Sequence, residues 1–178
     1  RAAVAAAEFG LPIAPGTLQN LKSCPIDDRT WNDESRSLFL RLLASGPALL
    51  QVWEEIDFVD IPGRLIPEWL AIRNRPSASA AHRYTIDRHS VEVVTRLGRE
   101  TPRGNRYDDR HYQALLLAGI LHDIGKRPWV ADHAAEGARH ASMVLKRMGF
   151  DRDIIWWVTL LVREHLTLSE FATGQNPN

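Results

Sequence analysis

Apolar residues recur every three or four positions along much of the chain, which is the spacing of one face of an α-helix. In the first half, this pattern predicts three helices, over residues 30–45, 47–56 and 67–70. Thr30 and Asp33 have the spacing of a helix cap, and Pro47 suits the first turn of a helix. Residues 1–29 are expected to form a helix end and a lead-in loop, and residues 58–67 an irregular segment, because proline and glycine interrupt both.

The second half has a clearer helical pattern. It predicts four helices, over residues 86–97, 112–121, 133–148 and 151–162. The second of these is apolar nearly all round, so it should lie at the centre of the fold, and Gly125 should stop it. Residues 74–85 are polar and are predicted to form a hinge, while residues 98–109 are predicted to form a charged loop. No long segment alternates with the two-residue period of a strand, so the predicted fold class is all-α.

Composition narrows the function classes. The 178 residues suffice for one well-filled domain, and the formal net charge is zero, so nucleic acid is not expected as a partner. The single cysteine, Cys24, excludes an internal disulfide and fits a reducing, cytoplasmic location. The longest apolar runs are about half a membrane span, so no membrane partner is expected. The chain begins at Arg1 without a methionine, and we expect it to be a piece of a larger protein.

An adjacent histidine and aspartate, His122 and Asp123, close the most apolar predicted helix. Three further histidines, His89, His133 and His165, lie at or near the ends of the other predicted helices in this half. Helix ends can converge on one point in a helical bundle, and imidazoles with a carboxylate are ligands for divalent metals. These five residues therefore form a candidate metal site for Mn, Fe, Co, Zn or Mg.

Other residues compete for places in this site. His140 shares a helix face with His133 but lies two turns further along, and we prefer His133 because Asp132 precedes it at a loop-to-helix transition. Asp123 is a candidate catalytic residue, which would bridge two ions or orient a water molecule. Lys126 is a second candidate, which could bind a phosphate oxygen in the transition state, or could equally be a solvated cation at a helix C-terminus.

Four segments of the sequence resemble motifs of a known protein family. They are His82-Arg83-Tyr84-Thr85-Ile86-Asp87-Arg88-His89, Leu121-His122-Asp123-Ile124-Gly125-Lys126, Asp132-His133-Ala134-Ala135-Glu136-Gly137-Ala138 and Val162-Arg163-Glu164-His165-Leu166-Thr167-Leu168. They resemble the HD phosphohydrolase superfamily and, within it, the family of bifunctional PII uridylyltransferase/uridylyl-removing enzymes. The resemblance runs from about residue 60 to the end.

The resemblance implies an HD-domain helical bundle over residues 81–178, preceded by a helical lead-in segment over residues 1–80. It implies that the five metal positions of the family are His89, His122, Asp123, His133 and His165. It also implies a metal-dependent phosphodiesterase that removes UMP, or AMP in some members, from a modified tyrosine of the PII signal protein. The nucleotidyltransferase and ACT domains of such enzymes would be partners in the full-length protein, and the transferase motif, Gly-Ser with paired aspartates, is absent from this sequence.

The sequence departs from the family near its end. Asn176 stands where the family usually has an aspartate, and an amide is a weaker ligand than a carboxylate for a hard cation. A second ion that depends on His133 and His165 would then bind weakly. Two alternatives stay open, namely an HD phosphohydrolase that acts on a small nucleotide and a catalytically degraded regulatory or docking module, and Asn176 supports the second of them. Arg83, Arg88 and Arg163 are candidates for phosphate or partner contacts.

Overall fold

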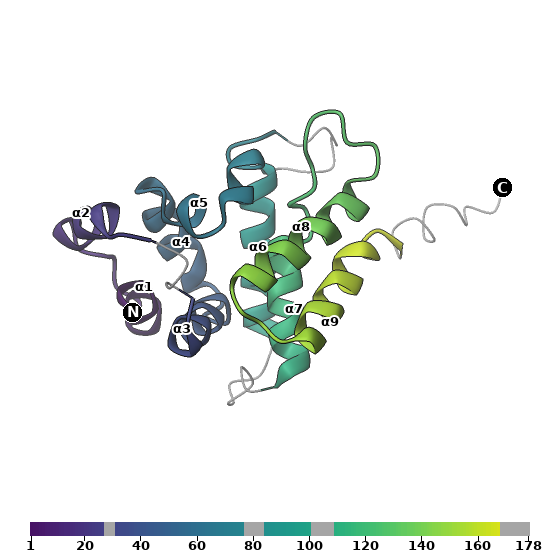
Figure 1. The fold of residues 1–178 in the computed structure, drawn as a ribbon. Coiled ribbons are helices and arrows are strands. Elements are labelled where there is room, and N and C mark those ends of the chain that lie inside the picture. The colour runs from purple at the N-terminus through teal and green to yellow at the C-terminus, as the bar shows by residue number, and fades with distance from the viewer. Residues whose placement is uncertain (27–30, 77–83, 101–108, 168–178) are drawn as a thin grey trace.

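The structure, a computed structural model, describes residues 1–26, 31–76, 84–100 and 109–167 (Figure 1). These ranges form helices and no β-sheet, apart from one isolated bridge between Pro76 and Thr85, so the all-α prediction is confirmed. The helices are α1 (Ala2–Phe9), α2 (Pro15–Ser23), α3 (Asp33–Leu43), α4 (Ala48–Phe58), α5 (Ile61–Leu65), the 3-10 helix η2 (Pro67–Ala71), α6 (Ile86–Glu100), α7 (Arg110–Leu121), α8 (His133–Arg147) and α9 (Arg152–Arg163).

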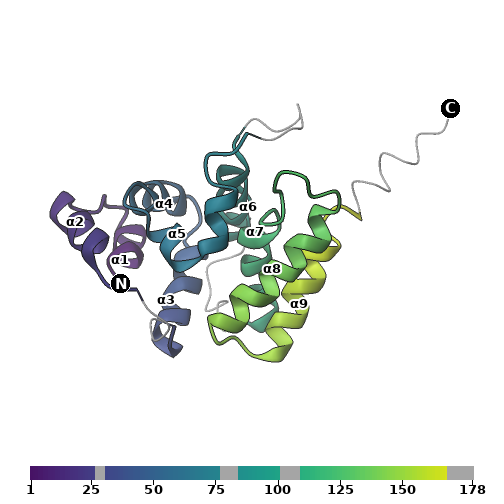
Figure 2. The ribbon, with the colours of Figure 1, turned by 45° about the horizontal axis from the view of Figure 1, so that its top comes forward.

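Helix α7 lies at the centre of the arrangement. In Figures 1 and 2, helices α1 to α5 lie on one side of α6 and α7, and α8 and α9 lie on the other. Leu116, Leu117 and Ile120 of α7 are fully buried, as the apolar pattern predicts for a central helix. Asp109 begins this helix, because its carboxylate accepts a hydrogen bond of 2.9 Å from the backbone N–H of His111.

One hydrophobic core connects the early and late helices. Leu43 of α3, Val94 of α6 and Val158 of α9 all belong to it and are fully buried. Helices α3 and α4 pack against α6, and α3 also packs against α7. The boundary predicted at residue 80 lies outside the described residues, so the division into a lead-in segment and an HD domain stays a prediction.

Three helices occur where the sequence suggested irregular structure or only a helix end. Residues 1–29 contain α1 and α2 rather than a helix end and a loop, and α5 lies within residues 58–67. Helix α1 buries Val4, Ala6 and Ala7, and it packs against α3 and α4. Short helices are marginal by themselves and are stabilised mainly by tertiary burial, which local periodicity does not report.

Two helix boundaries also differ from the predictions. Helix α3 begins at Asp33 and is capped by Asn32, whose Oδ1 accepts a hydrogen bond of 2.9 Å from Ser35 N–H, while Thr30 lies outside the described residues. Helix α6 continues to Glu100 through Gly98, which the sequence had placed in a loop. A Cβ atom on Gly98 would come within 2.7 Å of the Gly46 nitrogen, so this glycine allows α6 to cross the α3–α4 turn closely.

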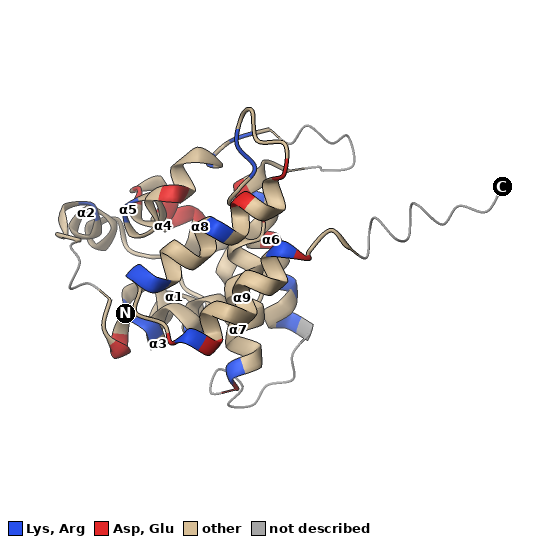
Figure 3. Cartoon of the chain, turned by 45° about the vertical axis from the view of Figure 1, so that its right-hand side comes forward, with Lys and Arg blue, Asp and Glu red and all other residues tan. Residues whose placement is uncertain are grey.

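Charged residues are spread over the helices, with basic and acidic positions interspersed (Figure 3). Arg147 of α8, for example, forms a two-bond ion pair with Glu68 of η2, at 2.9 and 2.6 Å. This mixture of signs agrees with the zero formal net charge of the sequence. None of the helices in the described ranges has the length and apolar character needed to cross a membrane.

Candidate metal centre

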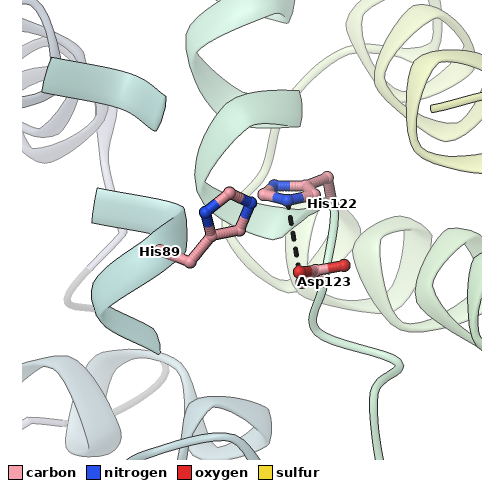
Figure 4. A group of neighbouring side chains, drawn as sticks. All are labelled: His89, His122 and Asp123. Atoms are coloured by element: carbon pink, nitrogen blue, oxygen red, sulfur yellow. Dashed lines mark ion pairs between the residues drawn. The ribbon is translucent and has the colours of Figure 1, made fainter. Parts of the chain in front are cut away.

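Four helices bring the five predicted ligands together. His89 lies in the first turn of α6, His122 and Asp123 directly follow α7, His133 begins α8, and His165 follows α9 closely. In Figure 4 the ring of His89 faces the ring of His122, and Asp123 lies beside His122. The ring centroids are 5.2 Å apart for His89 and His122, 5.3 Å for His122 and His165, and 5.6 Å for His133 and His165.

The five residues form two overlapping groups of possible ligands. One group is His89, His122 and Asp123, and the other is Asp123, His133 and His165. In each group the ligand atoms lie within 4.8 Å of one another. The shared member is Asp123, which is 1% exposed and has two carboxylate oxygens to offer. This arrangement can hold one divalent ion, or two with Asp123 between them.

Hydrogen bonds to helix carbonyls orient two of the imidazoles. Nδ1 of His122 lies 2.9 Å from the carbonyl oxygen of Gly119, and Nδ1 of His165 lies 2.7 Å from that of Val162. A carbonyl oxygen can only accept, so each Nδ1 carries the proton and donates it. Each Nε2 is then left with its lone pair, which is the form of imidazole that binds a metal.

Asp123 is held as a carboxylate by the groups around it. Burial by itself would raise its pKa, but hydrogen bonding and charge from His122 and His165 in their protonated, metal-free form, together with the ammonium of Lys126, outweigh burial and hold the pKa of Asp123 far below its usual range. Nζ of Lys126 donates a hydrogen bond of 2.9 Å to Oδ2, while Nε2 of His122 and Nε2 of His165 lie 3.4 and 3.5 Å from the carboxylate. An ionised carboxylate is the form that coordinates a hard cation.

The atoms of the second group that could bind a metal are buried and have no hydrogen-bond partner among the described residues. Oδ1 of Asp123, Nε2 of His133 and Nε2 of His165 have no hydrogen-bond partner within the part of the chain that the structure describes. Buried polar atoms normally find a partner, and a group of three that lack one points to something that binds them together. Two imidazole nitrogens and a carboxylate oxygen fit a divalent metal ion in charge and in chemistry. The residues present could therefore hold a divalent metal ion.

Two glycines allow α8 to begin beside Asp123. A Cβ atom on Gly125 would lie 2.2 Å from the carbonyl oxygen of His133 and 2.3 Å from the nitrogen of Gly137. Helix α7 itself ends at Leu121 with His122 as its C-cap, so Gly125 does not act as the predicted helix stop. Its lack of a side chain instead lets the turn after Asp123 touch the first turn of α8, which places His133 next to Asp123 and His165.

The candidate site opens into a cleft of about 480 Å³. Polar groups line one part of it, namely His89, His122, Asp123, Lys126 and His165, and apolar side chains line the rest, namely Val93, Leu97, Leu115, Ala118, Leu161 and Leu166. Leu115 and Leu161 are 39% and 41% exposed, so both contribute accessible apolar surface to the cleft. The sequence did not reveal this apolar wall, because Leu115 and Leu161 stand in apolar runs that read as core.

The remaining candidate residues lie elsewhere. His140 is buried and its Nε2 lies 2.8 Å from Oε1 of Glu136, and His111 is exposed and its ring lies 4.3 Å from that of Trp157. Arg88 pairs with Glu54 and Glu92, and exposed Arg163 lies 3.5 Å from Asp132. None of these four lines the cleft as described. His82, Arg83 and Asn176 lie outside the described residues.

Comparisons with known proteins identify a family. Residues 86–174 match the HD domain family. The chain is 40% identical over 177 residues to the bifunctional uridylyltransferase/uridylyl-removing enzyme of Streptomyces coelicolor, an alignment that covers 99% of this chain and 20% of that protein. It is 36% identical over 179 residues to the enzyme of the same name from Mycobacterium tuberculosis, covering 100% of this chain and 21% of that protein.

The chain thus spans about a fifth of the length of these two curated relatives. A relative of the same name from Corynebacterium glutamicum is 32% identical over 181 residues, which cover 100% of this chain and 25% of the relative. No solved structure matches the chain. From the match over residues 86–174, we conclude that the chain belongs to the HD domain family.

Proposed function

We propose that this chain is a metal-dependent phosphodiesterase that removes the nucleotidyl group, UMP or AMP, from a modified tyrosine of the PII signal protein. The observation that carries the proposal is the pair of ligand groups that share Asp123 at the edge of an open cleft. Membership of the HD domain family and relatives named for uridylyl removal support it. In the full-length protein, nucleotidyltransferase and ACT domains would accompany this part.

The proposed metal ligands are His89, His122, Asp123, His133 and His165. A divalent ion at such a site lowers the pKa of bound water and polarises a phosphoryl oxygen. Mn, Fe, Co, Zn and Mg all suit a mixed set of imidazoles and carboxylates to some degree. The second ligand group has its own buried donor atoms, so it could hold an ion without a contribution from Asn176.

Lys126 and Asp123 have the proposed catalytic roles. Nζ of Lys126 lies in the cleft and 2.9 Å from Asp123, so it can donate to a non-bridging phosphoryl oxygen bound beside that carboxylate. The negative charge on that oxygen grows in the transition state, and a fixed ammonium stabilises it more there than in the ground state. Asp123 stays ionised next to Lys126; its carboxylate would bridge two ions, or orient the attacking water if only one ion is bound.

The apolar wall of the cleft suits the groups on either side of a nucleotidylated tyrosine. A phosphodiester of this kind carries a phenol ring on one side and a nucleoside on the other. Leu115 and Leu161 offer exposed apolar surface next to the polar end of the cleft, where a ring can pack while the phosphate reaches Lys126. An open cleft of about 480 Å³ also admits a tyrosine that is still attached to its protein.

The experiment measures release of UMP or AMP from nucleotidylated PII protein, together with metal content by elemental analysis. We expect the wild-type chain to contain one or two equivalents of a divalent metal, and His122→Ala to lose both metal and activity. His140→Ala is the matched control, because His140 is buried on the same helix as His133 but outside both ligand groups. If Asp123→Ala, made in the otherwise intact enzyme, retained full nucleotidyl removal, the proposal would fail.

The two alternatives give different results in the same experiment. An HD phosphohydrolase that acts on a small nucleotide would turn over free nucleotides well and would not need the PII protein. A docking module would bind no metal and would show the same thermal unfolding with and without a chelator, whereas a bound ion stabilises the folded state by mass action.

A further inference from the structure

A second cavity lies on the other side of α6 from the candidate metal centre. It has a volume of about 270 Å³ and is lined by residues of α4, η2 and α6 and of the segment between η2 and α6. Asp87, Arg88 and Val91 face this cavity, while His89, Val93 and Leu97 of the same helix face the metal-site cleft. Helices α4 and α6, which form two of its walls, pack side by side (Figure 1).

Two carboxylates in this cavity have buried oxygen atoms without partners. Asp87 is 8% exposed; its Oδ2 accepts a hydrogen bond of 2.9 Å from the backbone N–H of Asn74, and its Oδ1 has no partner among the described residues. Oδ2 of Asp57 accepts a hydrogen bond of 3.0 Å from Nε of Arg73, and its Oδ1 also lacks a partner in the described ranges. A buried carboxylate oxygen without a donor is costly, and such atoms are rare in folded proteins.

The charges around the cavity are not balanced. Within the part of the chain described, Asp87 forms no ion pair. Arg73 already forms ion pairs with Asp57 and Asp60, and Arg88 already forms ion pairs with Glu54 and Glu92. Burial raises the pKa of Asp57, an effect that Arg73 partly offsets and the charge of Asp87 increases. A cation bound between the two aspartates would supply the missing positive charge.

The other walls restrict the kind of cation. Trp53 and Trp69 pack edge to face, with ring centroids 5.4 Å apart, and Leu50 and Val91 add aliphatic surface. Indole rings and aliphatic walls suit an organic cation, because the charge is attracted to the rings while a carbon chain fills apolar space. Trp69 also has a buried Nε1–H without an acceptor in the described structure, which a hydroxyl group on the ligand could satisfy.

We propose that this cavity is a second binding site, which takes a small aliphatic amine whose ammonium group is bound by Asp57 and Asp87. The ammonium lies between the two carboxylates, which both line the cavity, and its carbon chain lies against Trp53 and Trp69. Nothing in this site requires the metal centre, since the two cavities have no lining residue in common. Binding can therefore be measured without any enzyme assay.

The test is isothermal titration of the 178-residue chain at pH 7 with 4-amino-1-butanol, which is protonated at that pH, and with 1,4-butanediol as the uncharged control. We expect saturable binding of one amine per chain and no binding of the diol. Nitrogen–proton NMR gives an independent readout: the indole N–H signal of Trp69, assigned with Trp69→Phe, should shift with the amine alone.

Variants locate the site. Asp87→Asn and Asp57→Asn should each weaken amine binding at least tenfold, because each removes one charged partner. Asp60→Asn is the matched control, since Asp60 shares Arg73 with Asp57 but does not line the cavity, and asparagine tolerates its left-handed backbone (φ 63°). It should change binding less than twofold. Thermal unfolding checks that each variant folds. If Asp87→Asn does not fold, the amine affinity of Asp57→Asn tests the proposal.

Three results would overturn the proposal. The first is no saturable binding of the amine, which would mean that the two carboxylates share a proton or bind ordered water. The second is equal weakening by Asp60→Asn and Asp57→Asn, which would mean that only general charge attraction is involved. The third is a shift of the Trp69 signal with Mg²⁺ or Ca²⁺ but not with the amine, which would make the cavity an inorganic cation site.

Discussion

Replacing Gly125 with alanine should disrupt both the fold and the metal centre. The new Cβ would lie 2.2 Å from the carbonyl oxygen of His133 and 2.3 Å from the backbone nitrogen of Gly137, whereas ordinary contact begins at 3.4 Å. Both neighbours are backbone atoms at the start of α8, so no side chain can rotate away. The turn after Asp123 and the first turn of α8 would have to separate by about 1 Å, a displacement that is costly in a close-packed interior.

The loss of stability follows from the overlap between the new Cβ and the backbone of α8. Overpacking in a protein interior costs roughly 1–3 kcal/mol, and a backbone clash of this depth belongs at the upper end. A loss of about 3 kcal/mol corresponds to a fall in Tm of about 6–12 °C for a chain of this size. His133 would move away from Asp123 and His165, so affinity for a divalent metal should fall at least about tenfold.

The assay combines thermal unfolding followed by circular dichroism with a titration of Mn²⁺ into the chelator-treated chain. Gly16→Ala is the control, because Gly16 lies in α2 and an added Cβ meets nothing within 4 Å. That variant should keep the metal affinity and gain up to about 1 kcal/mol of stability, since alanine favours a helix. A Gly125→Ala variant with the Tm and metal affinity of the wild type would refute the reasoning about the close approach.

Three further predictions concern individual side chains. His133→Ala should reduce the metal content measured by elemental analysis, whereas equal reduction in His140→Ala would contradict the assignment of ligands. Lys126→Met should lower kcat for nucleotidyl removal about 10²–10³-fold and leave metal content unchanged, and unchanged kcat would exclude its proposed role. Burial of Glu68 works to raise its pKa, but the ion pair with Arg147 outweighs it, so the folded-state pKa lies below the unfolded value of 4.5. The stabilisation is therefore present above that pH and lost as the pH falls, so Glu68→Gln should cost about 1 kcal/mol at pH 7 and little in strong acid. Thermal unfolding at several pH values checks this, and a deficit that did not depend on pH would disprove it.

The sequence by itself determined the helical class and the chemistry of the candidate site. The long amphipathic segments that became α3, α4, α6, α8 and α9 have a periodicity that depends only on neighbouring residues, as does the apolar run of α7. His122 and Asp123 are adjacent in the chain, so their proximity was certain before any fold was known. The identities of the ligand atoms, imidazole nitrogens and a carboxylate, were also evident.

Only the tertiary structure decided which distant residues meet. Short helices depend on burial against other elements, which no local pattern encodes. Helix α1 packs against α3 and α4, and α5 packs against α4 and η2. His133 and His140 share one face of a helix, and only the approach of α8 to Gly125 places the first of them beside Asp123. The exposed Leu115 lies in a helix that the sequence predicts to be buried, and nothing in the sequence indicates that Asp57 and Asp87 line one cavity. The surroundings of these residues arise because helices that are far apart in the sequence pack together. Local sequence patterns do not report such contacts.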